Sequence, residues 1–112
     1  MDQTPPTDSD VEKAKQLRKK ILLALYRSFT EMPYAEMELG DLSKICGAEP
    51  ADLNWNMVYL EKCGLVELGH STDCPPFISC TAGITSAGVD LVESPERLNA
   101  KFQLNPEMEK LE

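Results

Sequence analysis

Two short blocks of sequence decide the fold of this chain: LEKCGLVE at residues 60–67 and ITSAGVDLVE at residues 84–93. In the first block, Gly64 closes a helix and a strand follows at once, because glycine readily takes the left-handed conformation that ends many helices. In the second block, a strand runs into a helix that Thr85 can cap. Residues 68–83, between the blocks, have the length of a β-hairpin. The predicted order is therefore helix, strand, turn, strand and helix.

A long first helix is predicted upstream of these blocks. Ser9 and Glu12 have the spacing of a capping box, which marks a helix start. Pro33 ends the helix by about Met32, because proline lacks the amide that helix continuation needs. Apolar residues recur between these limits at three- and four-residue steps and predict one buried stripe. Its members are Val11, Ala14, Leu17, Ile21, Ala24, Leu25 and Phe29.

A short edge strand and two further helices are predicted between Pro33 and Gly64. Residues 34–38 fit a half-buried extended piece, and residues 39–46 fit a short helix that Gly47 ends. A third helix begins with Pro50, where the missing amide costs nothing. The residues expected to face inward are Leu42 and Ile45 in the second helix, and Leu53, Met57 and Leu60 in the third.

The hairpin and the C-terminal region complete the predicted organisation. Residues 65–68 would be the outgoing strand and residues 77–80 the returning one, with turn-forming residues between them. Ser94 and Pro95 give a further cap-and-proline signal for a helix that holds Leu98 and Phe102. A chain of 112 residues supports one core. We expect a disordered tail at residues 1–8, a domain at 9–93, and a helical extension with a tail at 94–112.

Residues 42–93 resemble the winged-helix domains of MarR-like and PadR-like prokaryotic regulators. The resemblance is carried by DLSKI at residues 41–45 and by the two blocks at 60–67 and 84–90. It implies an α+β winged helix-turn-helix: a three-helix core with a β-hairpin wing, here followed by a helical extension. It also implies a homodimeric transcription regulator that lays its third helix in the major groove of DNA and rests its wing on the backbone.

Charge is distributed unevenly along the chain. The formal net charge of -8 and a pI near 4.6 argue against nonspecific affinity for nucleic acid or anionic lipid, because like charges repel. All the charged residues among 13–27 are cations, whereas residues 41–96 carry two lysines and nine carboxylates. Residues 65–84 contain no Lys or Arg. The first helix is therefore basic, and the predicted wing has no cation with which to contact phosphate.

The outward arc of the third helix is the predicted contact surface. An asparagine can read an adenine edge and a lysine can contact a phosphate, whereas an acid there would be repelled. The expected arc consists of Asp52, Asn54, Trp55, Val58, Tyr59 and Lys62. The residues predicted to contact DNA are Asn54 and Lys62 from this helix, Lys44 from the second, and Lys13, Lys15 and Lys19 from the first.

A second interpretation of the same surface stays open. Trp55 and Tyr59 are four residues apart and form an aromatic ridge, and such side chains commonly anchor protein partners. Together with Val58 they predict a protein-interaction module that does not bind DNA. The alternative is that Trp55 packs against the first helix or under the wing. The basic residues of the first helix could equally form only a solvated face.

Other kinds of site find little support in the sequence. His70, Cys74 and Cys80 lie in and around the predicted wing beside Asp73, but they lack the close cysteine pair of small zinc modules, so no metal or cofactor is predicted. Cys46 and Cys63 are expected to be small core residues. There is no phosphate-binding glycine loop and no nucleophile motif, which predicts a non-enzyme without an evident small-molecule ligand.

The location of the protein is predicted from what its N-terminus and its apolar runs lack. No basic and apolar leader begins the chain, and no apolar run is long enough to span a bilayer. A cytoplasmic protein with reduced cysteines is therefore expected.

Overall fold

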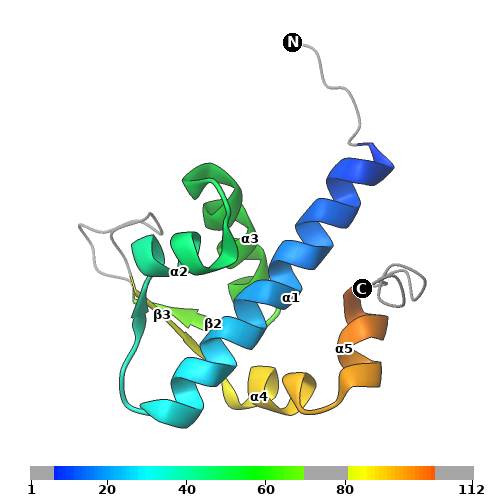
Figure 1. Ribbon diagram of the computed structural model, residues 1–112. Helices are drawn as coiled ribbons and strands as arrows, with labels where there is room; N and C mark the ends of the chain where they lie inside the picture. Colours follow the sequence, from blue (N-terminus) through cyan, green and yellow to red (C-terminus); the bar gives the residue numbers. More distant parts are fainter. Residues whose placement is uncertain (1–6, 70–80, 103–112) are drawn as a thin grey trace.

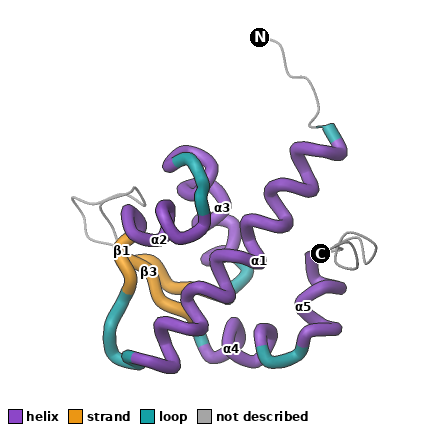
Figure 2. The backbone as a smooth tube through the Cα atoms, in the orientation of Figure 1, coloured by secondary structure: helices purple, strands orange, loops and turns teal. Residues whose placement is uncertain are grey.

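The computed structural model describes residues 7–69 and 81–102 of the chain (Figure 1). Within these residues, a long helix crosses a small sheet and two shorter helices, and two more helices follow the sheet (Figure 2). In chain order the elements are α1 (Asp8–Glu31), β1 (Met37–Glu38), α2 (Leu39–Cys46), α3 (Pro50–Lys62), β2 (Val66–Leu68), β3 (Thr81–Ile84), α4 (Ser86–Val92) and α5 (Pro95–Phe102).

The sheet is antiparallel with the order β1-β3-β2. Val66 pairs with Ile84 and Leu68 with Ala82, while Met37 pairs with Ala82 from the other side of β3. The strand that leaves α3 is thus paired with the strand that enters α4, as the two sequence blocks predict. The predicted return strand at residues 77–80 lies outside the described residues, and the strand that the structure describes on the returning side is β3.

One apolar core joins all the helices to the sheet. α1 contributes its C-terminal half to this core, and α1 also contacts α2, α3, α4 and α5. Burial of these side chains is the main stabilising term, since apolar area removed from water contributes about 25 cal/mol per Å². The core includes Ile21, Leu22, Leu25, Leu39, Leu42, Leu53, Met57, Leu60, Val66, Leu68, Ala82, Ile84, Leu91, Leu98 and Phe102.

Two glycines end the helices of the helix-turn-helix as predicted. Gly47 has a φ of 65° and Gly64 a φ of 75°, a region where a Cβ is unfavourable. In both turns an amide after the glycine bonds back across the last helical turn: Ala48 to the Ser43 carbonyl at 3.0 Å and Leu65 to the Leu60 carbonyl at 3.1 Å. These bonds satisfy helix carbonyls that would otherwise lack donors.

Thr85 links α3 to α4 through its hydroxyl, and its predicted capping role is confirmed. The hydroxyl accepts from the Gly88 amide at 3.1 Å and donates to the Gly64 carbonyl at 2.7 Å. One side chain therefore caps α4 and holds the turn after α3.

Three details of the predicted helices are wrong. α1 begins at Asp8, and its capping box is formed by Thr7 and Asp10 instead of Ser9 and Glu12. Ile45 is 61% exposed, because the buried stripe of α2 runs through Leu39, Leu42 and Cys46. The sequence pattern also placed Phe29 inside, but its ring is partly exposed at the end of α1.

None of the helices in residues 7–69 and 81–102 combines the length and the apolar character that crossing a bilayer requires.

Candidate nucleic-acid interface

The outward face of α3 carries large exposed side chains. Trp55 is 49% exposed and Tyr59 36% exposed, and Lys62 is exposed in the last helical turn. The opposite side of the helix is the core side, where Leu53, Met57 and Leu60 are buried as predicted. The predicted aromatic ridge is therefore present on the surface.

Arg18 of α1 lies over this ridge. Its guanidinium carbon is 4.0 Å from the centre of the Tyr59 ring and 5.3 Å from that of Trp55. A guanidinium over an aromatic face is attracted by the ring quadrupole, by roughly 0.5–1 kcal/mol where solvent has access and more where it is excluded. Trp55 is therefore half exposed, and it also contacts α1 through Arg18, as the packing alternative predicted.

Asn56 anchors the same guanidinium from below. Arg18 Nε donates to Asn56 Oδ1 at 2.8 Å, and Asn56 Nδ2 donates to the Asp52 carbonyl at 2.8 Å. Asn56 is only 1% exposed, so its amide depends on these partners. Hydrogen bonds to charged groups typically contribute about 1.5–3 kcal/mol. Arg18 is therefore held both by a buried amide and by two surface rings.

A pocket of about 300 Å³ joins the N-terminal half of α1 to the start of α3. Its lining includes Lys13 from α1 and Trp55 from α3, together with the two acids Asp10 and Asp52. One lysine predicted from the basic run therefore lies beside the aromatic ridge. The two nearby carboxylates partly offset its positive potential.

The remaining predicted lysines are more dispersed. Lys44 is exposed on α2, while Lys15 and Lys19 are half-buried on α1. Lys19 Nζ donates to Asn99 Oδ1 of α5 at 3.1 Å, so this lysine holds two helices together. The basic run of α1 therefore does not form one continuous phosphate-binding stripe.

Asn54 does not lie in the outward arc as the sequence pattern suggested. It is half-buried, and its Oδ1 is shielded from solvent without a hydrogen-bond partner among the residues that the structure describes. The reason is geometric, since successive helical residues are about 100° apart and Asn54 follows the buried Leu53. Val58 is likewise half-buried and packs against the core. The exposed arc of α3 is thus narrower than predicted.

Sequence reasoning missed two residues of this interface, Arg18 and Asn56. A signal for Asn56 exists, because it lies three residues after Leu53 and four before Leu60, which places a polar side chain on the buried face. Arg18 lies four residues from both Ala14 and Leu22, at the edge of the apolar stripe. Only the crossing of α1 and α3 brings these two residues together.

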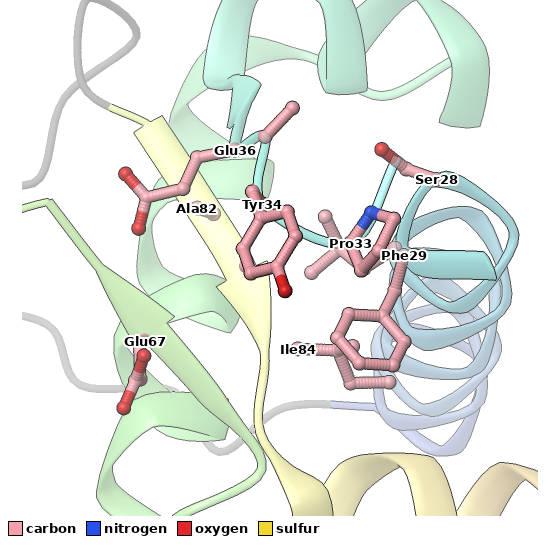
Figure 3. Close-up of a pocket in the computed structure, with 11 residues that line it drawn as sticks. Ser28, Phe29, Pro33, Tyr34, Glu36, Glu67, Ala82 and Ile84 are labelled. Atoms are coloured by element: carbon pink, nitrogen blue, oxygen red, sulfur yellow. The ribbon is translucent and has the colours of Figure 1, made fainter. Parts of the chain in front are cut away.

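A separate pocket of about 320 Å³ lies between the end of α1, the segment before β1, and the sheet (Figure 3). Phe29, Pro33 and Ile84 form its apolar side, and the carboxylates of Glu36 and Glu67 lie on its other side (Figure 3). The Thr81 hydroxyl donates to Glu36 Oε1 at 2.7 Å and ties the segment before β1 to β3.

Cys46 and Cys63 are the two cysteines in the part of the chain that the structure describes. Cys46 is buried, and burial raises the pKa of its thiol, an effect that the nearby Lys20 charge partly offsets. Cys63 is half-buried, so both residues contribute to packing as expected. In residues 7–69 and 81–102 no group of three His, Cys, Asp or Glu could hold a metal ion. His70, Asp73, Cys74 and Cys80 lie outside those ranges.

Comparisons with known proteins agree with this architecture. No protein-family model and no curated protein matches the chain. A solved structure described as MepR, a transcription regulator of the Staphylococcus aureus multidrug efflux pump MepA, matches 90% of this chain and 80% of its own, with a TM-score of 0.55 and 18% identity. A MepR mutant from a clinical isolate matches with the same TM-score and 16% identity, over 90% of this chain and 78% of its own. The predicted winged-helix fold is thereby confirmed.

Proposed function

We propose that this protein is a small winged-helix transcription regulator that binds duplex DNA as a homodimer through α3 and the basic α1. The observation that carries the proposal is the junction of these helices, where Lys13 and Arg18 of α1 lie beside Trp55 of α3. A cation and an exposed helix face on one surface suit the phosphate and the groove of DNA. The two structural neighbours with this fold are described as transcription regulators or their mutants, which supports the same function.

Electrostatics limits how strongly one subunit can bind. Affinity for duplex DNA rises with the number of phosphates that cations neutralise. α3 offers Lys62, α2 offers Lys44, and the sequence from Leu65 to Ile84 offers no cation. A homodimer would double this small number of contacts. We therefore expect modest affinity that falls steeply with salt.

Binding of a labelled random-sequence duplex, followed by fluorescence anisotropy across a salt series, tests the proposal. The wild-type protein should bind at ~50 mM salt and lose affinity as salt rises. The triple variant Lys13→Ala, Lys15→Ala, Lys19→Ala should bind more weakly and show a flatter salt dependence. A matched triple variant, Arg97→Ala, Lys101→Ala, Lys110→Ala, removes the same charge outside α1, α2 and α3 and should bind nearly as the wild type does.

Two results would reject DNA binding through this surface. One is undetectable binding of the wild type at ~50 mM salt, where phosphate contacts are strongest. The other is equal loss of affinity in both triple variants, which would mean that only net charge matters. Thermal unfolding of each variant serves as the folding control, because Lys19 also bonds Asn99. Light scattering after gel filtration measures the oligomeric state.

The exposure of the aromatic ridge supports a second candidate, a winged helix that binds a protein partner instead of DNA. Trp55 and Tyr59 are exposed on a face without a dense positive charge, which suits a protein interface. Replacing both with serine should leave the fold intact and abolish dimer or partner contact, as measured by gel filtration and circular dichroism. Loss of the fold would instead assign both rings to the core.

A further inference from the structure

The side chain of Arg18 joins α1 to three residues on one turn of α3. It donates to Asn56 at 2.8 Å, stacks on Tyr59 at 4.0 Å, and lies 5.3 Å from the centre of the Trp55 ring. Tyr59 and Trp55 are the large exposed side chains of this face, whereas Asn56 is buried beneath them. The contact therefore reaches from the protein interior to the outer surface of α3.

We propose that Arg18 is the positioning residue that sets the binding face of α3. It fixes the orientations of Trp55 and Tyr59, so the face has its binding shape only while α1 is packed against α3. This inference rests on the proposed function, since it concerns how the DNA-binding surface is shaped. It adds that a residue of the first helix decides the geometry of the third.

The chemistry of the contact requires an arginine. A guanidinium is flat, so it can stack on an aromatic ring while its Nε donates in the plane to Asn56. An ammonium is a compact, strongly hydrated charge without such a plane. Lysine at this position would keep the positive charge but could not make both contacts at once. Substituting lysine for Arg18 therefore tests its positioning role separately from its charge.

Because Trp55 and Tyr59 are exposed, loss of Arg18 would affect binding as well as stability. Trp55 and Tyr59 are each free on their outer side, and a half-exposed side chain without a fixed neighbour samples several rotamers. Holding both rings in one orientation lowers the entropy that a ligand must remove when it docks on them. Loss of Arg18 should thus weaken binding by leaving this ordering to the ligand.

The experiment uses the full chain and three variants. Arg18→Lys keeps the charge, and the double variant Arg18→Met, Asn56→Leu removes both hydrogen-bond partners so that no buried amide is left unpaired. Arg27→Lys is the matched control, because Arg27 lies on α1 and lines a different groove with Leu23 and Ile45. Urea unfolding shows that each variant is folded. Anisotropy with the random duplex measures binding across salt.

The fluorescence of Trp55 reports directly on the positioning, since it is the only tryptophan in the sequence. In the Arg18→Lys variant we expect faster local depolarisation and stronger acrylamide quenching of Trp55. We also expect duplex affinity about fivefold lower at every salt concentration, which is roughly the cost of ordering one more side chain on docking. The salt slope should stay unchanged, because the charge is kept. Arg27→Lys should change none of these properties.

Each other outcome overturns the inference in a distinguishable way. Unchanged Trp55 depolarisation in Arg18→Lys means that Arg18 does not position the ring. Altered depolarisation with wild-type affinity means that the orientation does not matter for binding. In a further outcome, Arg18→Lys behaves as the wild type does and the double variant Arg18→Met, Asn56→Leu lowers the salt slope by about one. That result assigns Arg18 to direct phosphate contact. A wild-type protein that does not bind duplex DNA rejects the proposed function itself, and the inference with it.

Discussion

The guanidinium of Arg18 stacks on the ring of Tyr59, with 4.0 Å between the guanidinium carbon and the ring centre. The two residues belong to α1 and α3, which the sequence separates by two other elements, β1 and α2. The contact lies above Asn56, so a buried amide, a cation and an exposed aromatic ring follow one another from the core to the surface. This layered contact defines the geometry of the candidate interface and makes it sensitive to single substitutions.

Replacing Asn56 should destabilise the fold. Asn56→Ala removes the acceptor of Arg18 Nε and the amide that donates to the Asp52 carbonyl. We expect a loss of about 1–3 kcal/mol in the free energy of unfolding, measured by urea denaturation. Asn54→Ala on the same helix is the matched control and should cost less, because Asn54 Oδ1 has no partner in the described chain. Equal losses for both variants would contradict this role of Asn56.

Gly83 in β3 should tolerate substitution by alanine, whereas Gly88 in α4 should not. A Cβ at Gly88 would meet the Leu65 carbonyl oxygen and would lie 2.6 Å from Ile84 Cγ1, so Gly88→Ala must shift α4 away from the strands. A Cβ at Gly83 would meet only Glu36, at 3.8 Å. Thermal unfolding should show a loss of about 1–3 kcal/mol for Gly88→Ala and little change for Gly83→Ala. The reverse order would mean that α4 packs differently.

The hydroxyl of Tyr26 should titrate above its ordinary range. It donates to Glu93 Oε2 at 2.8 Å, and this bond, followed by desolvation and repulsion from the Glu93 charge, raises the pKa of Tyr26 above 10.0. Ultraviolet absorbance titration should show one tyrosine whose midpoint falls in Glu93→Gln. Asp90→Asn, an exposed change on α4 three residues before Glu93, should leave that midpoint unchanged.

The same bond makes a small contribution to stability that depends on pH. The pKa of Tyr26 is higher in the folded than in the unfolded chain, so the contribution is fully present below about pH 10 and is lost as pH rises through the folded value. The stability difference between wild type and Tyr26→Phe should therefore shrink at alkaline pH. A difference that grows with pH would contradict the sign of the shift.

Cys46 should react more slowly than Cys63 with iodoacetamide. Burial both blocks access to Cys46 and raises the pKa of its thiol, so little reactive thiolate forms at about pH 8. Mass spectrometry of the digested protein distinguishes the two sites. Lys20→Ala should slow Cys46 further, since the Lys20 charge lowers the pKa of that thiol. Equal rates for Cys46 and Cys63 would show that α2 opens readily.

Much of the fold could be predicted because its signals are local. The ends of α2 and α3 follow from Gly47, Pro50 and Gly64, whose backbone preferences act within a few residues. The start of α1 was predicted wrongly, since Thr7-Asp10 and Ser9-Glu12 have the same capping spacing and sequence alone does not rank them. Ile45 was placed inside because apolar spacing does not say which face of a short helix is covered.

The candidate interface was less predictable because it depends on how helices cross. The ridge of Trp55 and Tyr59 was identified from their spacing, and it is exposed. Asn54 was placed on the outward arc, but the structure half-buries it. Lys13 was predicted and lies beside Trp55, whereas Arg18 belonged to the basic run without being recognised as a partner of Tyr59.

The sequence by itself determined the order of the elements, the glycine-closed helices, the hairpin connection and the uneven charge, because caps, turns and apolar periodicity act over a few residues. Only the tertiary structure decided which cations lie on the face of α3. That outcome depends on the rotation and crossing of α1, which are set by burying Ile21, Leu22 and Leu25 against the other elements. Once those side chains are buried, Arg18 lies over Tyr59 and Lys19 lies beside Asn99.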